Sequence, residues 1–258
     1  MRCFEVATSY VVLPTYNEGD NLRQLSEVLL SLDVPDLRVL VIDDASPDGT
    51  GDLADALASE HPGRVEVIHR AGKQGLGSAY RLGFATALER GADFIIQMDA
   101  DLSHPPSLIP QMLDALKQCD VVVGSRYTKG GGLDPKWPLR RKLLSWAANS
   151  YIRLVLGLPV SDVTTGFCGY TRKSLQEVDL QSIRCTGFVF LAELKYACHR
   201  LELRMEELPF VFNNRLLGKS KLSSAIILEA LWKVWLLRLT PPSGRVASES
   251  AEVSRKAA

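Results

Sequence analysis

The sequence predicts an α/β protein with a mostly parallel central sheet flanked by helices. Short runs of β-branched residues alternate with segments whose apolar residues recur at helical spacing. Polar residues follow several of the expected strands at the point where each strand ends, as they do around ligand sites of open parallel sheets. The chain of 258 residues, 46% of them hydrophobic, is long enough for one large domain of this kind.

The amino-terminal half contains the alternating pattern. The expected strands are 9–14, 37–43, 65–69, 94–98 and 121–125, and the expected helices are 20–32, 48–59, 77–90 and 106–118. In the first helix, Leu22, Leu25 and Leu29 form an apolar stripe behind Asp20, a candidate N-cap. Gly91 is expected to end the third helix.

The pattern changes after Arg126. A Gly- and Pro-rich loop is expected over 129–140, and strongly apolar helices over 141–156 and 223–239. Between these helices we expect a loop around 162–172, a helix over 187–200 and a strand over 205–212. The expected division is a catalytic domain (1–222, including helix 141–156), an amphipathic helix (223–239) and a disordered tail (240–258).

Composition excludes some functions. Thirty basic and thirty acidic residues give a net charge of zero, so no overall field attracts nucleic acid and no nucleic-acid partner is expected. Five scattered cysteines without a CxxC pair indicate reduced thiols in a reducing compartment. The first residues lack a signal-peptide pattern, and no stretch has the roughly 20 apolar residues that span a bilayer. A cytoplasmic protein, soluble or peripheral to a membrane, is expected.

Asp99 and Asp101 form the sharpest local signal. Alternation in an extended backbone directs both carboxylates to one side, with Ala100 pointing away. Two adjacent carboxylates repel unless a cation or a proton lies between them, and oxygen ligands without His or Cys favour Mg²⁺ or Mn²⁺. Since capping of the helix expected from Pro106 needs only one carboxylate, we favour the metal site.

Other strand ends give weaker signals. Asp43 and Asp44 face opposite ways, and we favour Asp43 as the contact with a nucleotide base or ribose. Ser46, Asp48 and Gly49 suit a turn and a helix cap. The run GKQGLGSAY (72–80) matches no phosphate-loop spacing and indicates a tight turn with close backbone approach. His104 is expected to cap a helix or to lie at the surface.

Several motifs occur in an order typical of one enzyme family. VVLPTYNE, VIDDASPDGT, MDADLSH, VGSRY, TTGF and RLLGKSK resemble family 2 glycosyltransferases of the GT-A (Rossmann-like) fold, and most of all dolichol-phosphate or polyprenol-phosphate mannosyltransferases. The resemblance covers the chain to about Leu239. The QxxRW signature of processive synthases and the multi-helix carboxy-terminal anchor of some relatives are missing from the sequence.

The resemblance implies roles for the matching positions on the donor side. Nucleotide contacts correspond to Pro14, Tyr16, Glu18, Ile42 and Asp43, and the metal and diphosphate site corresponds to Asp99, Ala100 and Asp101. Arg126, Arg215 and Lys221 match positions that clamp the nucleotide sugar. The third metal contact is often a glutamine, and Ser103 stands there, so a water can substitute.

On the acceptor side, RRKLLS resembles the segment that receives a lipid phosphate. Arg141 and Ser145 lie one helical turn apart and can both reach that phosphate. Cys168 stands where relatives usually carry an arginine, which puts one loop contact in doubt. Helices 141–156 and 223–239 carry polar stripes and aromatic residues on otherwise apolar surfaces, and we favour docking at a membrane interface over burial in the core.

Together these features predict an enzyme that transfers mannose from GDP-mannose to dolichyl or polyprenyl phosphate with inversion, at the cytoplasmic face of a membrane. A lipid phosphate is already anionic, so charge stabilisation by the metal, Arg126, Arg215 and Lys221 matters more than a general base. A glucosyl or other hexosyl transferase, and a non-catalytic nucleotide-sugar-binding scaffold, stay open as alternatives. A separate membrane-anchoring subunit also stays open.

Overall fold

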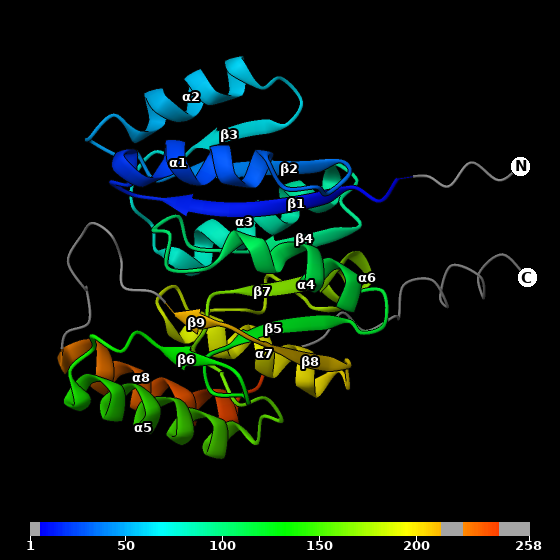
Figure 1. Ribbon diagram of the computed structural model, residues 1–258. Coiled ribbons are helices and arrows are strands. Elements are labelled where there is room, and N and C mark those ends of the chain that lie inside the picture. The colour runs from blue at the N-terminus through cyan, green and yellow to red at the C-terminus, as the bar shows by residue number, and fades with distance from the viewer. Residues whose placement is uncertain (1–5, 213–223, 243–258) are drawn as a thin grey trace, which may run out of the picture.

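A seven-stranded mixed sheet forms the centre of the molecule (Figure 1). The structure, a computed structural model, describes residues 6–212 and 224–242, without the side chains of 224–231. The strands are β1 (Ser9–Thr15), β2 (Leu37–Asp43), β3 (Val65–His69), β4 (Phe94–Gln97), β5 (Val121–Ser125), β7 (Cys168–Thr171) and β8 (Met205–Pro209). Their order is β3-β2-β1-β4-β7-β5-β8, and β7 is antiparallel to both of its neighbours.

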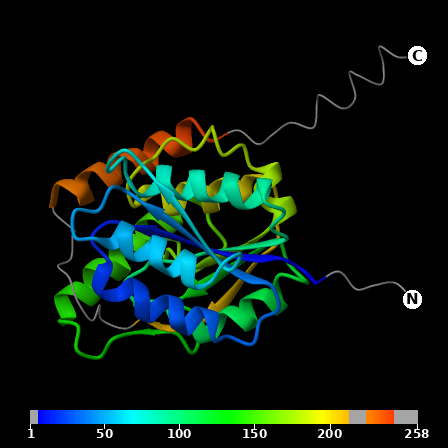
Figure 2. The ribbon, with the colours of Figure 1, turned by 90° about the horizontal axis from the view of Figure 1, so that it is seen from above.

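Helices cover both faces of this sheet. They are α1 (Gly19–Leu30), α2 (Thr50–Glu60), α3 (Leu76–Glu89), the 3₁₀ turn η1 (Pro106–Leu108), α4 (Ile109–Ala115), α5 (Leu139–Leu156), α6 (Arg172–Glu177), α7 (Val189–Arg200) and α8 (Ser224–Leu239). One buried cluster joins the sheet to α1, α2 and α4, and a second joins it to α3, α5, α7 and α8. Figure 2 shows α1 and α2 on one side of the sheet and α3 and α8 on the other.

The predicted α/β class, with a mostly parallel sheet, is confirmed, and so are the bounds of β2, β3 and β5. β2 and β5 are buried on both faces, which selects runs rich in β-branched residues that are easy to recognise. No helix among residues 6–212 and 224–242 is long and apolar enough to cross a bilayer.

Two strands were not predicted, β7 and the short β6 (Gly132–Leu133). The segment expected to be a loop around 162–172 contains β7, which pairs with β4 on one side and with β5 on the other. Cys168 therefore lies buried inside the sheet rather than in a loop, so it does not make the loop contact that the sequence analysis had put in doubt. In the expected loop 129–140, β6 pairs with β9 (Val211–Phe212), and Phe210 separates β9 from β8.

Helix starts also differ from the sequence-based expectation. α1 begins at Gly19, and Asp20 makes no capping bond, so the Asp20 cap is wrong. Asp48 supports the start of α2 as expected, because its carboxylate accepts hydrogen bonds from the Thr50 amide and hydroxyl. The helix expected over 106–118 is a 3₁₀ turn followed by seven residues of α-helix. The expected tail from residue 243 onward lies outside the described residues.

Close contact between α3 and β1 depends on Gly83. A Cβ atom at this position would lie 2.3 Å from Cγ1 of the buried Val12, whose β-branched side chain has little freedom to move. We expect Gly83→Ala to lower the free energy of unfolding by about 1–3 kcal/mol through overpacking, despite the better helix propensity of alanine. Urea denaturation measures this change. Gly72→Ala, where the added Cβ meets nothing within 4 Å, is the control, and equal stability of the two variants would contradict the account.

Candidate functional site

Three loops at the carboxyl edge of the sheet have a left-handed backbone at residues other than glycine. These residues are Asn17 after β1 (φ 59°), Ala45 after β2 (φ 54°) and Leu102 after β4 (φ 60°). For a bulky side chain such as that of Leu102, this conformation is an outlier that costs about 1–2 kcal/mol. Because strained backbone concentrates where function requires a particular geometry, the three loops mark one candidate site.

The acidic turn after β4 is held by short hydrogen bonds. Oδ1 of Asp101 accepts the Ser103 amide at 3.1 Å and the Ser103 hydroxyl at 2.5 Å, which closes the turn around Leu102. Asp101 is 3% exposed, whereas Asp99 is half-buried at the edge of the site. A Cβ at position 166 would lie 3.2 Å from Oδ1 of Asp99, so Gly166 provides the space in front of this carboxylate.

Tyr80 of α3 holds the side chain of Asp99 through a hydrogen bond. Its hydroxyl lies 2.9 Å from the Met98 carbonyl and 3.1 Å from Oδ1 of Asp99, and its ring stacks between Phe84 and Phe190. Burial, together with the charge of Asp99, raises the pKa of Tyr80 well above its ordinary value. Tyr80 is therefore a protonated donor that orients Asp99, and the sequence analysis missed it.

His104 is buried, so the expectation that it caps a helix or lies at the surface is wrong. Its Nδ1 accepts the Asp99 backbone amide at 3.2 Å, and its ring stacks on Phe167 with centroids 5.0 Å apart. Burial lowers the pKa of His104, although the charges of Asp99 and Asp101 oppose this shift. A neutral imidazole that accepts a backbone hydrogen bond supports the turn, and its Nδ1 is occupied.

The donor set at this turn fits a hard divalent cation. Oδ2 of Asp99 accepts no hydrogen bond from the described residues and is open to a ligand. The described residues contain no group of three His, Cys, Asp or Glu side chains that could hold a metal without other ligands. Two carboxylates are what Mg²⁺ usually takes from a protein before water and substrate phosphates complete its shell. Ser103 contributes through Asp101, because its hydroxyl is bonded to that carboxylate.

The expected nucleotide side lies at the ends of β1 and β2, where Pro14 and Ile42 are paired in register. Ile42 is fully buried, and Ala100, which is 3% exposed, also belongs to the core. Because both side chains pack inside the protein, only the main chains of these residues face the edge of the sheet. Lys73 lies over the ring of Tyr16, with Nζ 4.3 Å from the centroid. This stacking brings a cation from the glycine-rich segment to the first loop.

Carboxylates at the nucleotide side are already held by the protein. Asp43 accepts the Ser46 hydroxyl at 2.6 Å, and Glu18 accepts the Asn21 side-chain amide at 3.0 Å. Asp44 forms a buried ion pair with Arg70 at 2.7 Å. Burial raises the pKa of Asp44 despite the charge of Arg70. The neighbours Asp43 and Asp44 thus have different partners, as their alternation predicted.

Gly75 and Gly77, at the start of α3, lie in close contact with another segment of the chain. A Cβ on Gly77 would lie 2.4 Å from the Cys185 carbonyl, and the Gly77 amide donates to the Thr186 carbonyl at 2.9 Å. Gly75 has a φ of 94° and faces Thr186 as well. The expected close backbone approach is confirmed, and it is to the segment that precedes α7. In place of the expected tight turn, the chain has bends at Ala71 and Gly72.

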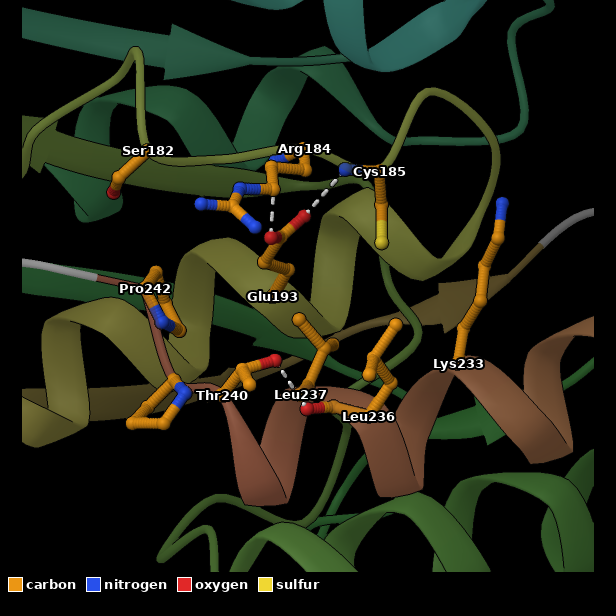
Figure 3. Close-up of a pocket in the computed structure, with 10 residues that line it drawn as sticks. Ser182, Arg184, Cys185, Glu193, Lys233, Leu236, Leu237, Thr240 and Pro242 are labelled. Carbon is orange, nitrogen blue, oxygen red and sulfur yellow. Dashed lines mark hydrogen bonds between the residues drawn. The ribbon is translucent and has the colours of Figure 1, made fainter.

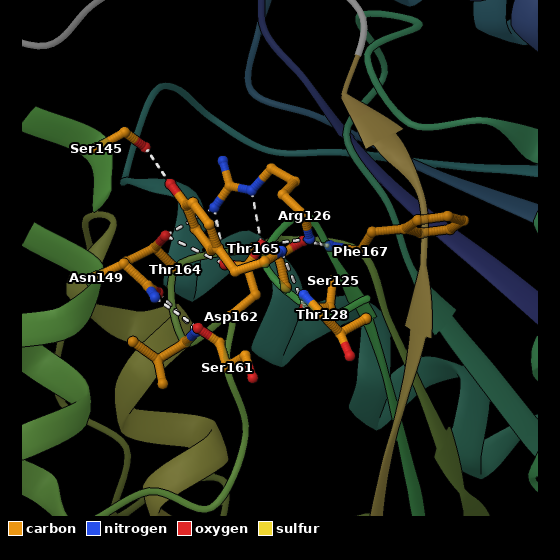
Figure 4. Close-up of polar contacts among 12 residues, drawn as sticks. Ser125, Arg126, Thr128, Ser145, Asn149, Ser161, Asp162, Thr164, Thr165 and Phe167 are labelled. Atoms are coloured by element: carbon orange, nitrogen blue, oxygen red, sulfur yellow. Dashed lines mark hydrogen bonds and ion pairs between the residues drawn. The ribbon is translucent and has the colours of Figure 1, made fainter. Parts of the chain in front are cut away.

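Arg126 is locked by Asp162, a residue that the sequence analysis did not single out. Nε and Nη2 of Arg126 bond the two Asp162 oxygens at 2.7 and 2.8 Å, and the Arg126 amide adds a third bond at 3.0 Å (Figure 4). Nη2 also donates to the Thr164 hydroxyl at 2.7 Å. Burial would raise the pKa of Asp162, but the charge and hydrogen bonds of Arg126 outweigh it and hold that pKa below its ordinary value.

The residues expected on the acceptor side lie on α5. Ser145 Oγ is 2.8 Å from the Tyr127 hydroxyl, next to Arg126, and the Arg141 guanidinium lies 3.7 Å from the Trp137 ring centroid. The structure thus brings Ser145 towards the end of β5, beside Arg126 (Figure 4). Arg215 and Lys221 lie outside the described residues.

A separate cavity of about 200 Å³ lies between the end of α8 and the segment before α7 (Figure 3). Leu236, Leu237 and Thr240 line it from one side. Glu193, which accepts the amides of Arg184 and Cys185, lies on the other side. None of the candidate site residues lines this cavity, so we assign it no part in the site.

Comparisons with known proteins agree with this arrangement. Residues 10–179 match Glycosyl transferase family 2. The chain is 45% identical to an undecaprenyl-phosphate mannosyltransferase from Micrococcus luteus, over 86% of this chain and 90% of that one. It is 42% identical to polyprenol monophosphomannose synthase from Mycolicibacterium smegmatis, over 88% of this chain and 86% of that one. A dolichol-phosphate mannosyltransferase from Pyrococcus furiosus is 37% identical, over 88% of this chain and 62% of that one.

Among solved structures, the fold is similar to that of glucosyl-3-phosphoglycerate synthase from Mycobacterium tuberculosis. That enzyme was crystallised with Mn²⁺, uridine diphosphate and glucosyl-3-phosphoglycerate. The TM-score is 0.65 at 19% identity, over 92% of this chain and 81% of the other. The matches define the class of protein, a glycosyltransferase. The chain belongs to glycosyltransferase family 2, as its motifs indicated.

The buried pair of Arg126 and Asp162 makes a prediction for stability. Asp162→Asn leaves the guanidinium buried without a counter-charge, and we expect the free energy of unfolding at neutral pH to fall by about 3–5 kcal/mol. Because the folded-state pKa of Asp162 is lowered, its stabilisation is present above the ordinary aspartate pKa of about 3.9 and is lost as the pH falls through the folded-state value.

Urea denaturation at several pH values measures both effects. The matched control is Asp114→Asn, which removes an exposed ion pair with Lys117 and is expected to change stability by less than about 1 kcal/mol. A difference between wild type and Asp162→Asn that stays constant into strong acid would contradict this account.

Proposed function

We propose that this glycosyltransferase transfers mannose from GDP-mannose to a polyprenyl or dolichyl phosphate, with inversion at the anomeric carbon. Two mannosyltransferase relatives above 40% identity, each matched over most of its length, support the sugar and the acceptor class. The observation that carries the proposal is the turn in which Ser103, His104 and Tyr80 hold the backbone and carboxylates of Asp99 and Asp101 at the sheet edge.

Asp99 and Asp101 would hold Mg²⁺ or Mn²⁺ against the diphosphate of the donor. The Mn²⁺ bound by the structural neighbour from Mycobacterium tuberculosis supports this choice of cation. When bound, such a cation stabilises the negative charge that develops on the departing nucleoside diphosphate. The protein contributes the geometry, since Tyr80 and Ser103 fix the orientation of the two carboxylates before substrate arrives.

In this proposal the acceptor phosphate meets Arg141 and Ser145 on α5, while Arg126 clamps the nucleotide sugar. The acceptor phosphate is anionic at neutral pH, so attack on the anomeric carbon requires no strong general base. His104 is buried and its Nδ1 already accepts the Asp99 backbone amide, which makes it unsuited to that role. Arg126, with Arg215 and Lys221 from outside the described residues, is assigned to anion binding.

Exposed aromatic and aliphatic side chains on α5 and α8 support docking to a membrane surface. The two helices pack side by side, and Leu143 and Trp146 of α5 are 56% and 59% exposed (Figure 1). On α8, Trp232, Trp235 and Leu239 are at least half exposed at helical spacing. Such residues insert into the headgroup region of a bilayer, which suits an enzyme whose acceptor is a lipid. The cytoplasmic face of a membrane is the proposed location.

The division into a catalytic domain (1–222), helix 223–239 and a tail (240–258) is likewise proposed. Val234 and Leu237 of α8 are buried against the main core, so this helix docks firmly on the catalytic domain. A separate anchoring subunit is compatible with the exposed face of α5 and α8. The alternative functions are transfer of another hexose and scaffolding without catalysis. The first experiment below distinguishes them from mannose transfer.

A panel of sugar nucleotides, incubated with a short-chain polyprenyl phosphate and Mn²⁺ or Mg²⁺, tests the proposed reaction. We expect transfer from GDP-mannose and a fall in kcat/KM of about 100-fold or more for Asp99→Ala and Asp101→Ala, because the diphosphate loses its metal-mediated stabilisation. Asp52→Ala, which removes an exposed carboxylate on α2, is the control. Full activity of the Asp99 and Asp101 variants would overturn the site, and absence of any transfer would favour the scaffold.

Vesicle binding tests the membrane surface. We expect the double variant Trp232→Ser, Trp235→Ser to bind polyprenol-containing vesicles about tenfold more weakly or worse, because apolar area that enters the interface is lost. Leu82→Ser on α3, which removes an exposed aliphatic side chain elsewhere, is the matched control. Equal sedimentation of the two variants with vesicles would contradict docking through α8.

A further inference from the structure

Helix α5 is attached to the rest of the molecule along a narrow stripe. Of its eighteen residues, Asn149, Ile152 and Leu156 are buried, all in the second half of the helix. Leu139, Leu143 and Trp146 of the first half are more than half exposed. The half that carries the proposed acceptor residues Arg141 and Ser145 is therefore held in place from further along the helix.

Asn149 is the one polar residue in that buried stripe. It was expected in a polar stripe of the helix, and it is 3% exposed. Its amide nitrogen donates to the Ser161 carbonyl at 2.5 Å, and its amide oxygen accepts the Val163 amide at 2.8 Å. Asn149 thus binds the two backbone groups on either side of Asp162 (Figure 4).

Asp162, between those two bonds, directs its carboxylate to Arg126. It accepts three hydrogen bonds from Arg126 and is fully buried. A continuous polar path therefore runs from α5 through residues 161–163 to Arg126. A second tie joins the same two regions, because Ser145 bonds Tyr127, the residue after Arg126.

α5 makes apolar contacts and hydrogen bonds, and the two kinds of contact restrict its position differently. Apolar contacts of Ile152 and Leu156 stabilise the helix against the core, but they are non-directional and permit sliding or rotation. The paired hydrogen bonds of Asn149 require a particular distance and angle, so they fix the axial position of the helix. Arg141, Ser145 and Asn149 follow one another at intervals of four residues, and therefore lie along one side of α5.

We propose that Asn149 is a positioning residue that sets the distance between the acceptor-binding turn of α5 and Arg126 through Asp162. The inference rests on the proposed function, in which Arg141 and Ser145 meet the acceptor phosphate next to Arg126, which clamps the nucleotide sugar. An error of about 1 Å in such a constellation can cost a hundredfold in rate. Without Asn149, Arg141 and Ser145 shift relative to Arg126, whereas Arg126 keeps its three bonds to Asp162. The loss therefore affects acceptor binding and leaves Asp99 and Asp101 in place.

The test compares Asn149→Leu with wild type in steady-state assays against a short-chain polyprenyl phosphate and GDP-mannose. Leucine keeps the branched heavy-atom skeleton of asparagine and removes both hydrogen bonds. We expect KM for the acceptor to rise about tenfold, as for the loss of one buried polar pair, while KM for GDP-mannose changes by less than about twofold. Titration of the acceptor phosphate without donor should show the same loss of affinity.

Ile152→Ala is the matched control, because it loosens the same helix at the next buried position without touching the polar path. It should lower the thermal midpoint at least as much as Asn149→Leu and leave KM for the acceptor unchanged. An unchanged acceptor KM in Asn149→Leu, an equal rise in both KM values, or the same shift in Ile152→Ala would overturn the proposal. If wild-type protein makes no mannosyl lipid, the proposed function fails instead, and acceptor titration still tests the role of Asn149.

Discussion

The candidate site depends on the insertion of β7, antiparallel, between β4 and β5. Without β7, strands β4 and β5 would be direct neighbours. The acidic turn after β4 and Arg126 after β5 would then have no segment between them. The segment that leads into β7 fills this space, with Asp162 against Arg126 and Gly166 against Asp99. Lys195 of α7, fully buried, supports the segment by donating to the Thr165 carbonyl at 2.8 Å. One topological feature therefore sets the separation of the residues proposed to bind the metal and those proposed to bind anions.

Charge in this region is arranged before any ligand arrives. Arg126 is neutralised by a bidentate bond to Asp162, whose cost of burial is offset by three hydrogen bonds from one partner. Asp99 has no comparable cation among the described ion pairs, and its Oδ1 accepts the Tyr80 hydroxyl, while Oδ1 of Asp101 accepts the hydroxyl and amide of Ser103. The site thus keeps negative charge at the end of β4 and compensated positive charge at the end of β5, a polarity suited to a metal-bound diphosphate beside an anionic acceptor.

The sequence was sufficient where structure is set locally. Buried parallel strands are continuous β-branched runs, and the Asp-Ala-Asp turn has a short spacing, so β2, β5 and the acidic pair could be predicted. β7 could not, because it is only four residues long, contains Gly169 and gains its conformation from partners on both sides. Asp162 was also not singled out from the sequence, and His104 was expected at a helix cap or at the surface. Their partners Arg126 and Phe167 are distant in sequence, and burial that depends on such contacts leaves no local pattern.

Anomalous diffraction from crystals soaked with Mn²⁺ and GDP tests the central claim most directly, that one divalent cation joins Asp99 and Asp101 to the diphosphate of the donor. A single Mn²⁺ peak between the two carboxylates, with a diphosphate oxygen completing its ligands, is the predicted result. GDP bound in the same cleft with no Mn²⁺ beside either carboxylate, or with the cation held by other residues, would contradict the account.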